Sequence, residues 1–196
     1  MTSWDKYAAS AERWSDEQYA DARRYLAHRA ELIRSLGPAL QPGDTVLDLA
    51  CGDGGLADFL GDLRYVGVDA SEEMVAVGTG RGRALVQADL NDYEPPEPVQ
   101  ATTIFRAVYY ARDRRALFMH IRSYTERKLV FDLNPRQYRL DDVRADLHAA
   151  GFTRLDIRPF FVPQTRAAPF LTQLERSGPL ARLLLRYRFT LLCAAS

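Results

Sequence analysis

The feature that most constrains the fold is a short apolar segment that runs directly into closely spaced glycines. Residues 45–50 (TVLDLA) read as a buried strand, because they are apolar, partly β-branched and preceded by turn residues. Residues 51–55 are CGDGG, and residues 56–60 return to helical spacing. A strand, a glycine turn and a helix in this order are typical of the ligand-binding corner of a doubly wound sheet, where glycine lets the backbone approach a ligand closely.

Strand-like and helix-like segments alternate along the rest of the chain. The predicted strands are residues 65–68, 84–87, 101–105, 128–133, 155–157 and 186–192, and the predicted helices are residues 15–36, 71–77, 113–123 and 140–150. Gly151 follows the last of these helices, where a left-handed cap is required. Alternation of this length indicates a parallel sheet with helices on both faces. The predicted fold is therefore α/β, a doubly wound and mostly parallel sheet of seven strands.

The length of 196 residues is that of one folding unit, so we predict a single domain over residues 1–196. Residues 1–40 would form an N-terminal helical cap of this domain. Residues 161–180 contain three prolines and no clean period, which indicates an insertion that could act as a lid.

Composition excludes several other classes of protein. Apolar residues make up 47% of the chain, which is enough for a sizeable core and excludes intrinsic disorder. No segment reaches the roughly 18 apolar residues that cross a bilayer, and the N-terminus lacks a signal-peptide pattern, so we expect a cytoplasmic protein. Cys51 and Cys193 are the only cysteines, so neither a disulfide framework nor a metal site is predicted.

The charge balance bears on the partners of the chain. Its 26 basic and 26 acidic residues give a net charge of zero, which argues against sequence-independent binding to nucleic acid. The charges are unevenly placed, because residues 1–100 hold 9 basic and 18 acidic residues and residues 101–196 hold 17 and 8. Either the two halves face different ligands, or they attract one another within one fold.

Acidic residues stand in or directly after the first three strands that follow the long helix. Asp48 lies inside the first strand near the glycines, where a carboxylate is a poor neighbour for a pyrophosphate and a good one for a cationic ligand. Asp69 follows the second strand and could accept both hydroxyls of a ribose. Asp89 follows the third and could accept a hydrogen bond from an adenine amino group. Three acids and no basic residue thus line the expected cofactor site.

Together these segments resemble the S-adenosylmethionine site of the class I methyltransferases. Residues 46–54 (VLDLACGDG) match the first motif of that family, with Ala50 in place of a glycine that many members carry. Asp69 and Asp89 match the acids after its second and third strands. The resemblance extends over the whole chain in strand order and implies a last strand that runs antiparallel to the others. It implies S-adenosylmethionine as cofactor, S-adenosylhomocysteine as product, and a cofactor site made of Asp48, Ala50, Cys51, Gly52, Gly54, Asp69, Ala70, Met74, Asp89, Leu90 and Arg106.

The exit of the fourth strand, within residues 102–110, lies where members of this family place groups around the methyl acceptor. The acid often found at the start of that strand is absent, since Ala101 and Thr102 stand there. A tyrosine beside an arginine, or a histidine on the following helix, could accept a proton. The catalytic candidates are Tyr109, Tyr110 and His120, and the candidates for acceptor binding are Tyr7, Trp14, Arg106, Asn134 and Arg136.

Asn134-Pro135-Arg136 partly matches the Asn-Pro-Pro-aromatic motif of nucleic-acid amino methyltransferases. That motif belongs after the fourth strand, whereas this tripeptide follows the fifth and lacks the second proline and the aromatic residue. We therefore predict no nucleic-acid partner.

The predicted function is S-adenosylmethionine-dependent methyl transfer to a small-molecule acceptor by a monomer or a homodimer. Arginines on the acceptor side with few acids expected nearby favour an acceptor with an anionic group. They are Arg106, Arg112, Arg114, Arg115, Arg136 and Arg158. The apolar and basic residues 180–192 leave open peripheral contact with a lipid substrate, without stable membrane insertion. Two alternatives are a catalytically silent S-adenosylmethionine-binding module and a nicotinamide-dependent oxidoreductase, because residues 50–55 also resemble a dinucleotide fingerprint.

Overall fold

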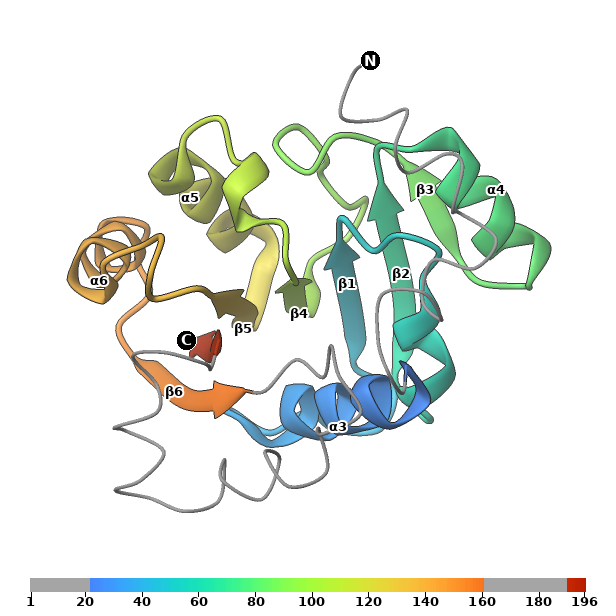
Figure 1. The fold of residues 1–196 in the computed structure, drawn as a ribbon, viewed down its shortest axis with the longest axis horizontal. Coiled ribbons are helices and arrows are strands. Elements are labelled where there is room, and N and C mark those ends of the chain that lie inside the picture. The colour runs from blue at the N-terminus through green and yellow to red at the C-terminus, as the bar shows by residue number, and fades with distance from the viewer. Residues whose placement is uncertain (1–21, 161–189) are drawn as a thin grey trace.

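The computed structural model describes residues 22–160 and 190–196, and its centre is one sheet of seven strands (Figure 1). The strands are β1 (Thr45–Leu49), β2 (Arg64–Asp69), β3 (Leu85–Gln87), β4 (Val99–Ile104), β5 (Thr125–Leu133), β6 (Leu155–Phe160) and β7 (Thr190–Ala195). Their order across the sheet is β3-β2-β1-β4-β5-β7-β6. Pairing is parallel from β3 to β5, and β7 is antiparallel to both β5 and β6. The predicted fold class, with its antiparallel last strand, is confirmed.

Helices connect the strands within the described residues. They are α3 (Ala22–Ser35), α4 (Glu72–Gly80), α5 (Arg114–Tyr124), α6 (Leu140–Ala149) and the 3-10 helices η2 (Gly55–Phe59) and η3 (Val108–Tyr110). Ser71 Oγ accepts the Met74 N–H at the start of α4, and Gly151 takes a φ of 92° after α6. Residues 56–60 were expected in an α-helix, but left-handed Gly54 and Gly61 bound this segment and leave room for one short turn only.

Side chains of the central strands alternate between two hydrophobic cores, one on each face of the sheet. On one face, Val46 and Val130 belong to the same core as Ile33 of α3. On the other face, Leu47 belongs to the core that contains Phe118 of α5 and residues of α6. Helices therefore cover both faces, as predicted, and Figure 1 shows α3 apart from the α5 and α6 pair.

The order of the strands reverses beside β1, which lies between β2 and β4. In open α/β sheets, ligands bind outside the carboxyl ends of the strands at such a reversal. The glycine turn follows β1 and Arg106 follows β4, so both lie at this edge.

Some predictions fall outside the described residues, namely those on Tyr7, on Trp14 and on the insertion at 161–180. The seventh strand was predicted at residues 186–192, whereas β7 extends to Ala195. Its last three residues, Cys193 to Ala195, are fully buried, but alanine carries little strand signal in a sequence. None of the helices in the described ranges has the length and low polarity that a bilayer crossing requires.

Candidate functional site

The turn after β1, residues 50–55, is called the glycine loop below. It changes direction through left-handed residues, with φ of 56° at Ala50, 61° at Gly52 and 73° at Gly54. Glycine adopts this conformation freely, whereas an L-residue such as Ala50 is strained in it. A strained backbone persists only where the surrounding structure holds it in place, and such residues cluster at functional sites. The strain at Ala50 therefore marks the end of β1 as a candidate site.

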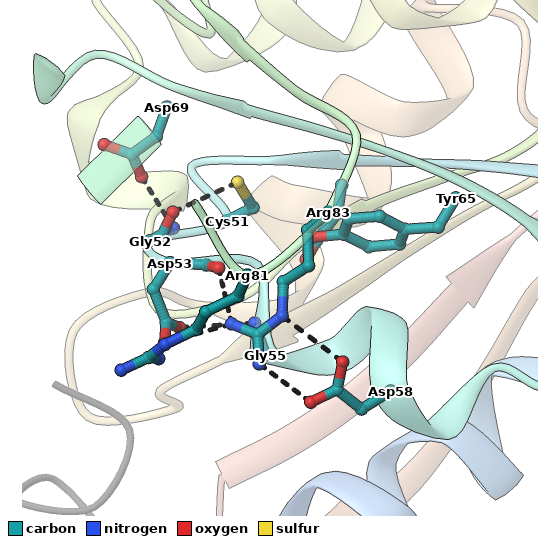
Figure 2. Close-up of polar contacts among 10 residues, drawn as sticks. Cys51, Gly52, Asp53, Gly55, Asp58, Tyr65, Asp69, Arg81 and Arg83 are labelled. Atoms are coloured by element: carbon teal, nitrogen blue, oxygen red, sulfur yellow. Dashed lines mark hydrogen bonds and ion pairs between the residues drawn. The ribbon is translucent and has the colours of Figure 1, made fainter. Parts of the chain in front are cut away.

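Asp53 fastens the glycine loop to the turn between α4 and β3 (Figure 2). Its side chain is 2% exposed and accepts from Arg81 Nη1 at 2.6 Å, from Arg83 Nη1 at 3.1 Å and from the Gly55 N–H at 3.2 Å. Arg83 Nη1 also donates to the Asp53 carbonyl oxygen at 2.7 Å. A Cβ on Gly78 of α4 would stand 2.5 Å from this carbonyl oxygen. Buried charge and close helix packing therefore hold the glycine loop.

Asp69 ends β2 and contacts the glycine loop (Figure 2). Its Oδ2 accepts the Gly52 N–H at 2.7 Å, and its Oδ1 accepts the Ser71 N–H at 2.9 Å. Burial raises the pKa of this carboxyl, and the backbone hydrogen bonds oppose that rise. A carboxylate offers about four acceptor positions, so positions remain on Asp69 for ligand donors. These acceptor positions fit the two hydroxyl donors of a ribose and hence the nucleoside part of S-adenosylmethionine.

Asp89 follows β3 and is held by the residues after it. Its Oδ1 accepts from the Asn91 N–H at 2.8 Å and from Asn91 Nδ2 at 2.7 Å, and its Oδ2 accepts from Arg112 Nη2 at 3.0 Å. Burial raises the pKa of Asp89, but the hydrogen bonds from Asn91 and the charge of Arg112 outweigh it, so the pKa lies below the ordinary value. Asp89 therefore presents an ionised carboxylate at the end of β3.

Asp48 is enclosed by the protein itself and is 1% exposed. It accepts from Thr103 Oγ1 at 2.6 Å and from the Tyr65 hydroxyl at 3.1 Å, and Arg29 Nη2 lies 3.7 Å away. Burial raises the pKa of Asp48, and Arg29 and the two hydrogen bonds oppose the rise. Arg29 also lies over the Phe105 ring, 3.6 Å from its centroid. The cation next to Asp48 is thus a side chain of α3, and sequence analysis missed these partners.

The other predicted cofactor residues stand at the same strand ends. Cys51 lies in the glycine loop, Ala70 follows β2, Met74 lies in the first turn of α4, and Leu90 follows Asp89. Burial raises the pKa of the Cys51 thiol well above its ordinary value, so the thiol stays neutral and unreactive near neutral pH. Met74 and Leu90 are buried, and they contribute apolar packing to this edge.

The exit of β4 contains a second strained residue, Arg106, with a φ of 53°. Its N–H donates to Asp132 Oδ1 on β5 at 2.6 Å. Burial raises the pKa of Asp132, and this hydrogen bond opposes the rise. Because Leu49 of β1 pairs with Ile104 of β4, the two strained turns lie next to each other. Asp132 was missed, although an acid inside the apolar run 128–133 signals a buried carboxylate that needs a partner.

The predicted catalytic residues lie in two places. Tyr109 and Tyr110 form most of η3 just beyond the β4 exit, with ring centroids 4.3 Å apart, and Tyr109 is 53% exposed. His120 lies in the second half of α5, with Nε2 at 2.9 Å from the Tyr93 carbonyl oxygen. Because a carbonyl oxygen only accepts, we infer that Nε2 carries a proton. The structure brings the two tyrosines to the carboxyl edge of the sheet and joins His120 to the loop between β3 and β4.

Asn134 and Arg136 follow β5 at the same edge of the sheet, where the Asn134 Oδ1 accepts the Arg136 N–H at 3.0 Å. The expectation that few acids lie near the arginines of the second half is wrong for three of them. The pairs are Arg112 with Asp89 and Asp92, and Arg114 and Arg115 with Asp146. These acids are 20 or more residues away in sequence, so local composition did not reveal the pairs.

No group of three potential ligand side chains that could hold a metal ion occurs in residues 22–160 and 190–196.

Part of the chain is similar to a known protein family, and its fold is similar to that of solved structures. Residues 46–128 match the family model described as "Methyltransferase domain", and no curated protein sequence matches the chain. Among solved structures, a putative methyltransferase of Haloferax volcanii, in complex with the Trm112 methyltransferase activator, is 19% identical with a TM-score of 0.66. The alignment covers 97% of this chain and 96% of that one.

Two further structures were solved with small molecules. Phosphoethanolamine N-methyltransferase 2 of Haemonchus contortus, with phosphomonomethylethanolamine and S-adenosylhomocysteine, is 18% identical with a TM-score of 0.60, over 86% of this chain and 52% of that one. Geranyl diphosphate C-methyltransferase of Streptomyces coelicolor A3(2), with Mg²⁺, geranyl diphosphate and S-adenosylhomocysteine, is 15% identical with a TM-score of 0.66, over 93% and 84%. At these identities the likeness shows a shared fold.

Proposed function

We propose that this chain, whose residues 46–128 match a methyltransferase domain, uses S-adenosylmethionine to methylate a small molecule that carries an anionic group. The observation that carries the proposal is the carboxylate of Asp69. It is fixed by the Gly52 and Ser71 N–H groups beside a strained glycine loop, and acceptor positions remain for a ribose.

S-adenosylmethionine, when bound, supplies a methyl group activated by a sulfonium sulfur. Asp69 would accept the ribose hydroxyls, and Asp89 would accept the adenine amino group through its remaining Oδ2 position. The protein then has to align the acceptor with the methyl group and exclude water between them. Tyr109 and Tyr110 stand at the exit of β4, where they could contact the acceptor and shield it from solvent.

Two arginines support an anionic acceptor. Arg106 and Arg136 follow β4 and β5, at the carboxyl edge that also carries the glycine loop. The backbone of each is held by a neighbour, since Asp132 accepts the Arg106 N–H and Asn134 accepts the Arg136 N–H. A guanidinium on a fixed backbone suits bidentate contact with a carboxylate or a phosphate. Phosphomonomethylethanolamine and geranyl diphosphate, which are bound in the two neighbouring structures described above, carry phosphate groups, which agrees with this proposal.

The test is incubation with S-adenosylmethionine labelled in the methyl group and with small-molecule and lipid extracts of the source organism. We expect label in a small anionic product and no label with Asp69→Ala. Binding of S-adenosylhomocysteine without transfer to any fraction would instead favour a silent binding module.

Once the acceptor is known, Arg106→Gln and Arg136→Gln should raise its KM and leave the affinity for S-adenosylhomocysteine intact. Arg154→Gln is the matched control, because this arginine is exposed and precedes β6 at the opposite edge of the sheet. A neutral or cationic acceptor, or wild-type kinetics in both variants, would refute the anionic acceptor.

A further inference from the structure

The side chain of Asn91 connects the cofactor side of the site to the acceptor side. Its Nδ2 donates to Asp89 Oδ1 at 2.7 Å and to the Tyr110 carbonyl oxygen at 3.2 Å. Its Oδ1 accepts the Arg112 N–H at 3.0 Å. Asn91 belongs to the loop after β3, whereas Tyr110 and Arg112 belong to the segment after β4. One amide therefore bridges two loops that are about 20 residues apart in sequence.

The bridge needs both a donor and an acceptor on one short side chain. The Asp89 carboxylate and the Tyr110 carbonyl oxygen only accept, and the Arg112 N–H only donates. Asparagine meets all three partners, and this pattern also fixes the orientation of its amide. Aspartate would keep the acceptor and lose both donors, and alanine would lose all three contacts.

The second link between the two loops is weaker. Arg112 pairs with Asp89 and Asp92 through its guanidinium, but its side chain is 62% exposed. Exposed ion pairs are screened by water and salt and hold geometry poorly. The partly buried amide of Asn91 is therefore the better candidate for the link that sets the position of η3.

We propose that Asn91 is a positioning residue, which fixes the tyrosine-bearing turn η3 (Val108–Tyr110) relative to the cofactor acid Asp89. This inference rests on the proposed function, because it takes Asp89 as the acceptor of the adenine amino group. When a ligand holds Asp89, Asn91 loses freedom to move, and so do the Tyr110 carbonyl and the Arg112 N–H that it binds. Cofactor binding on β3 thereby steadies the residues that would face the acceptor.

Hydrogen exchange by mass spectrometry on the full chain, with and without saturating S-adenosylhomocysteine, tests this role. In the wild type we expect slower exchange across residues 107–112 when the ligand is bound. Asn91→Ala should still bind S-adenosylhomocysteine in calorimetry, but residues 107–112 should exchange about tenfold faster and no longer respond to the ligand. Asn91→Asp should also lose the response, because it keeps the acceptor and neither donor.

Two further variants separate this role from general loosening of the fold. Gln100→Ala removes another bridging amide, which accepts the Thr45 N–H at 2.8 Å and donates to Glu126 at the opposite edge of the sheet. It should leave exchange at 107–112 unchanged. Arg112→Ala keeps its backbone N–H on Asn91 and should retain the response to S-adenosylhomocysteine.

The inference is overturned if Asn91→Ala exchanges like the wild type and responds to the ligand, or if Arg112→Ala alone abolishes the response. Absence of any S-adenosylhomocysteine binding by the wild type is a different result, and it would refute the proposed function.

Discussion

Asp53→Ala should destabilise the protein by about 3 kcal/mol, whereas Asp58→Ala should cost less than about 1 kcal/mol. Both acids pair with Arg83, but the side chain of Asp53 is 2% exposed and that of Asp58 is 54% exposed. Removing the Asp53 carboxylate takes the acceptor from the buried Gly55 N–H, at about 1–3 kcal/mol, and deletes a charge-assisted bond to Arg83, at about 1.5–3 kcal/mol. Arg81 is 43% exposed and returns to water, so we assign its lost pair less than about 1 kcal/mol. These contributions share partners and are not additive, so we take the lower part of their sum.

Urea denaturation monitored by circular dichroism measures the free energy of unfolding lost in each variant, and the m value shows whether the unfolded state has changed. Asp53→Asn keeps an oxygen for the Gly55 N–H and should fall between Asp58→Ala and Asp53→Ala. Calorimetry with S-adenosylhomocysteine should show weaker binding by Asp53→Ala, because the glycine loop loses the side-chain contacts of Asp53 with Arg81, Arg83 and the Gly55 N–H and keeps only the backbone contact with Arg83. Equal losses for Asp53→Ala and Asp58→Ala would refute the reasoning, since burial would then have no bearing on how the loop is held.

Three other substitutions test separate features. Asp69→Ala should weaken binding of S-adenosylhomocysteine by about 1.5–3 kcal/mol in calorimetry. Because burial raises the pKa of Asp69, the wild-type affinity for S-adenosylhomocysteine should, as pH is lowered, begin to fall at a higher pH than for an ordinary aspartate. An unchanged dissociation constant in Asp69→Ala would remove Asp69 from the site. Lys128 is fully buried and donates to the Leu36 carbonyl oxygen at 2.8 Å, and burial lowers its pKa to about 8. Between pH 8 and 10.5 the unfolded chain binds this proton and the folded chain does not, so Lys128 contributes stability that grows by on the order of 3 kcal/mol as pH rises. The free energy of unfolding of the wild type should therefore rise by this amount relative to that of Lys128→Met over this range, and parallel curves would contradict the assignment. Ala50→Gly should raise stability by about 0.5–1 kcal/mol in thermal unfolding, because relief of left-handed strain exceeds the entropy that glycine adds to the unfolded chain; a lower Tm would contradict it.

The sequence was sufficient for features that depend on local pattern. Period and turn residues located β1 to β5, and the caps at Ser71 and Gly151 are visible as single residues in the right place. Asp69 and Asp89 could be found because the carboxyl ends of parallel strands meet at one edge, so residues that follow successive strands become neighbours.

The partners of the buried charges could not be predicted in this way. Arg29 belongs to the predicted helix 15–36, where helical spacing gives it no partner, yet in the structure it is buried beside Asp48. The approach of α3 to the sheet decides this contact, and helical spacing carries no information about that approach. The same holds for Asp132, whose partner is a backbone N–H made available only by the left-handed turn at Arg106.

The position of β7 has a consequence for synthesis of the protein. β7 lies between β5 and β6, although it follows both of them along the chain (Figure 1). On the ribosome, β1 to β5 with the glycine loop, Asp69 and Asp89 emerge early and can pair with one another, whereas β6 emerges before the strand that joins it to them. Until Thr190–Ala195 has emerged, the apolar β5 is an open sheet edge and β6 has no place in the sheet. Open edges promote association between chains, so a nascent chain stalled before residue 190 should be far more prone to aggregate than one stalled after β7.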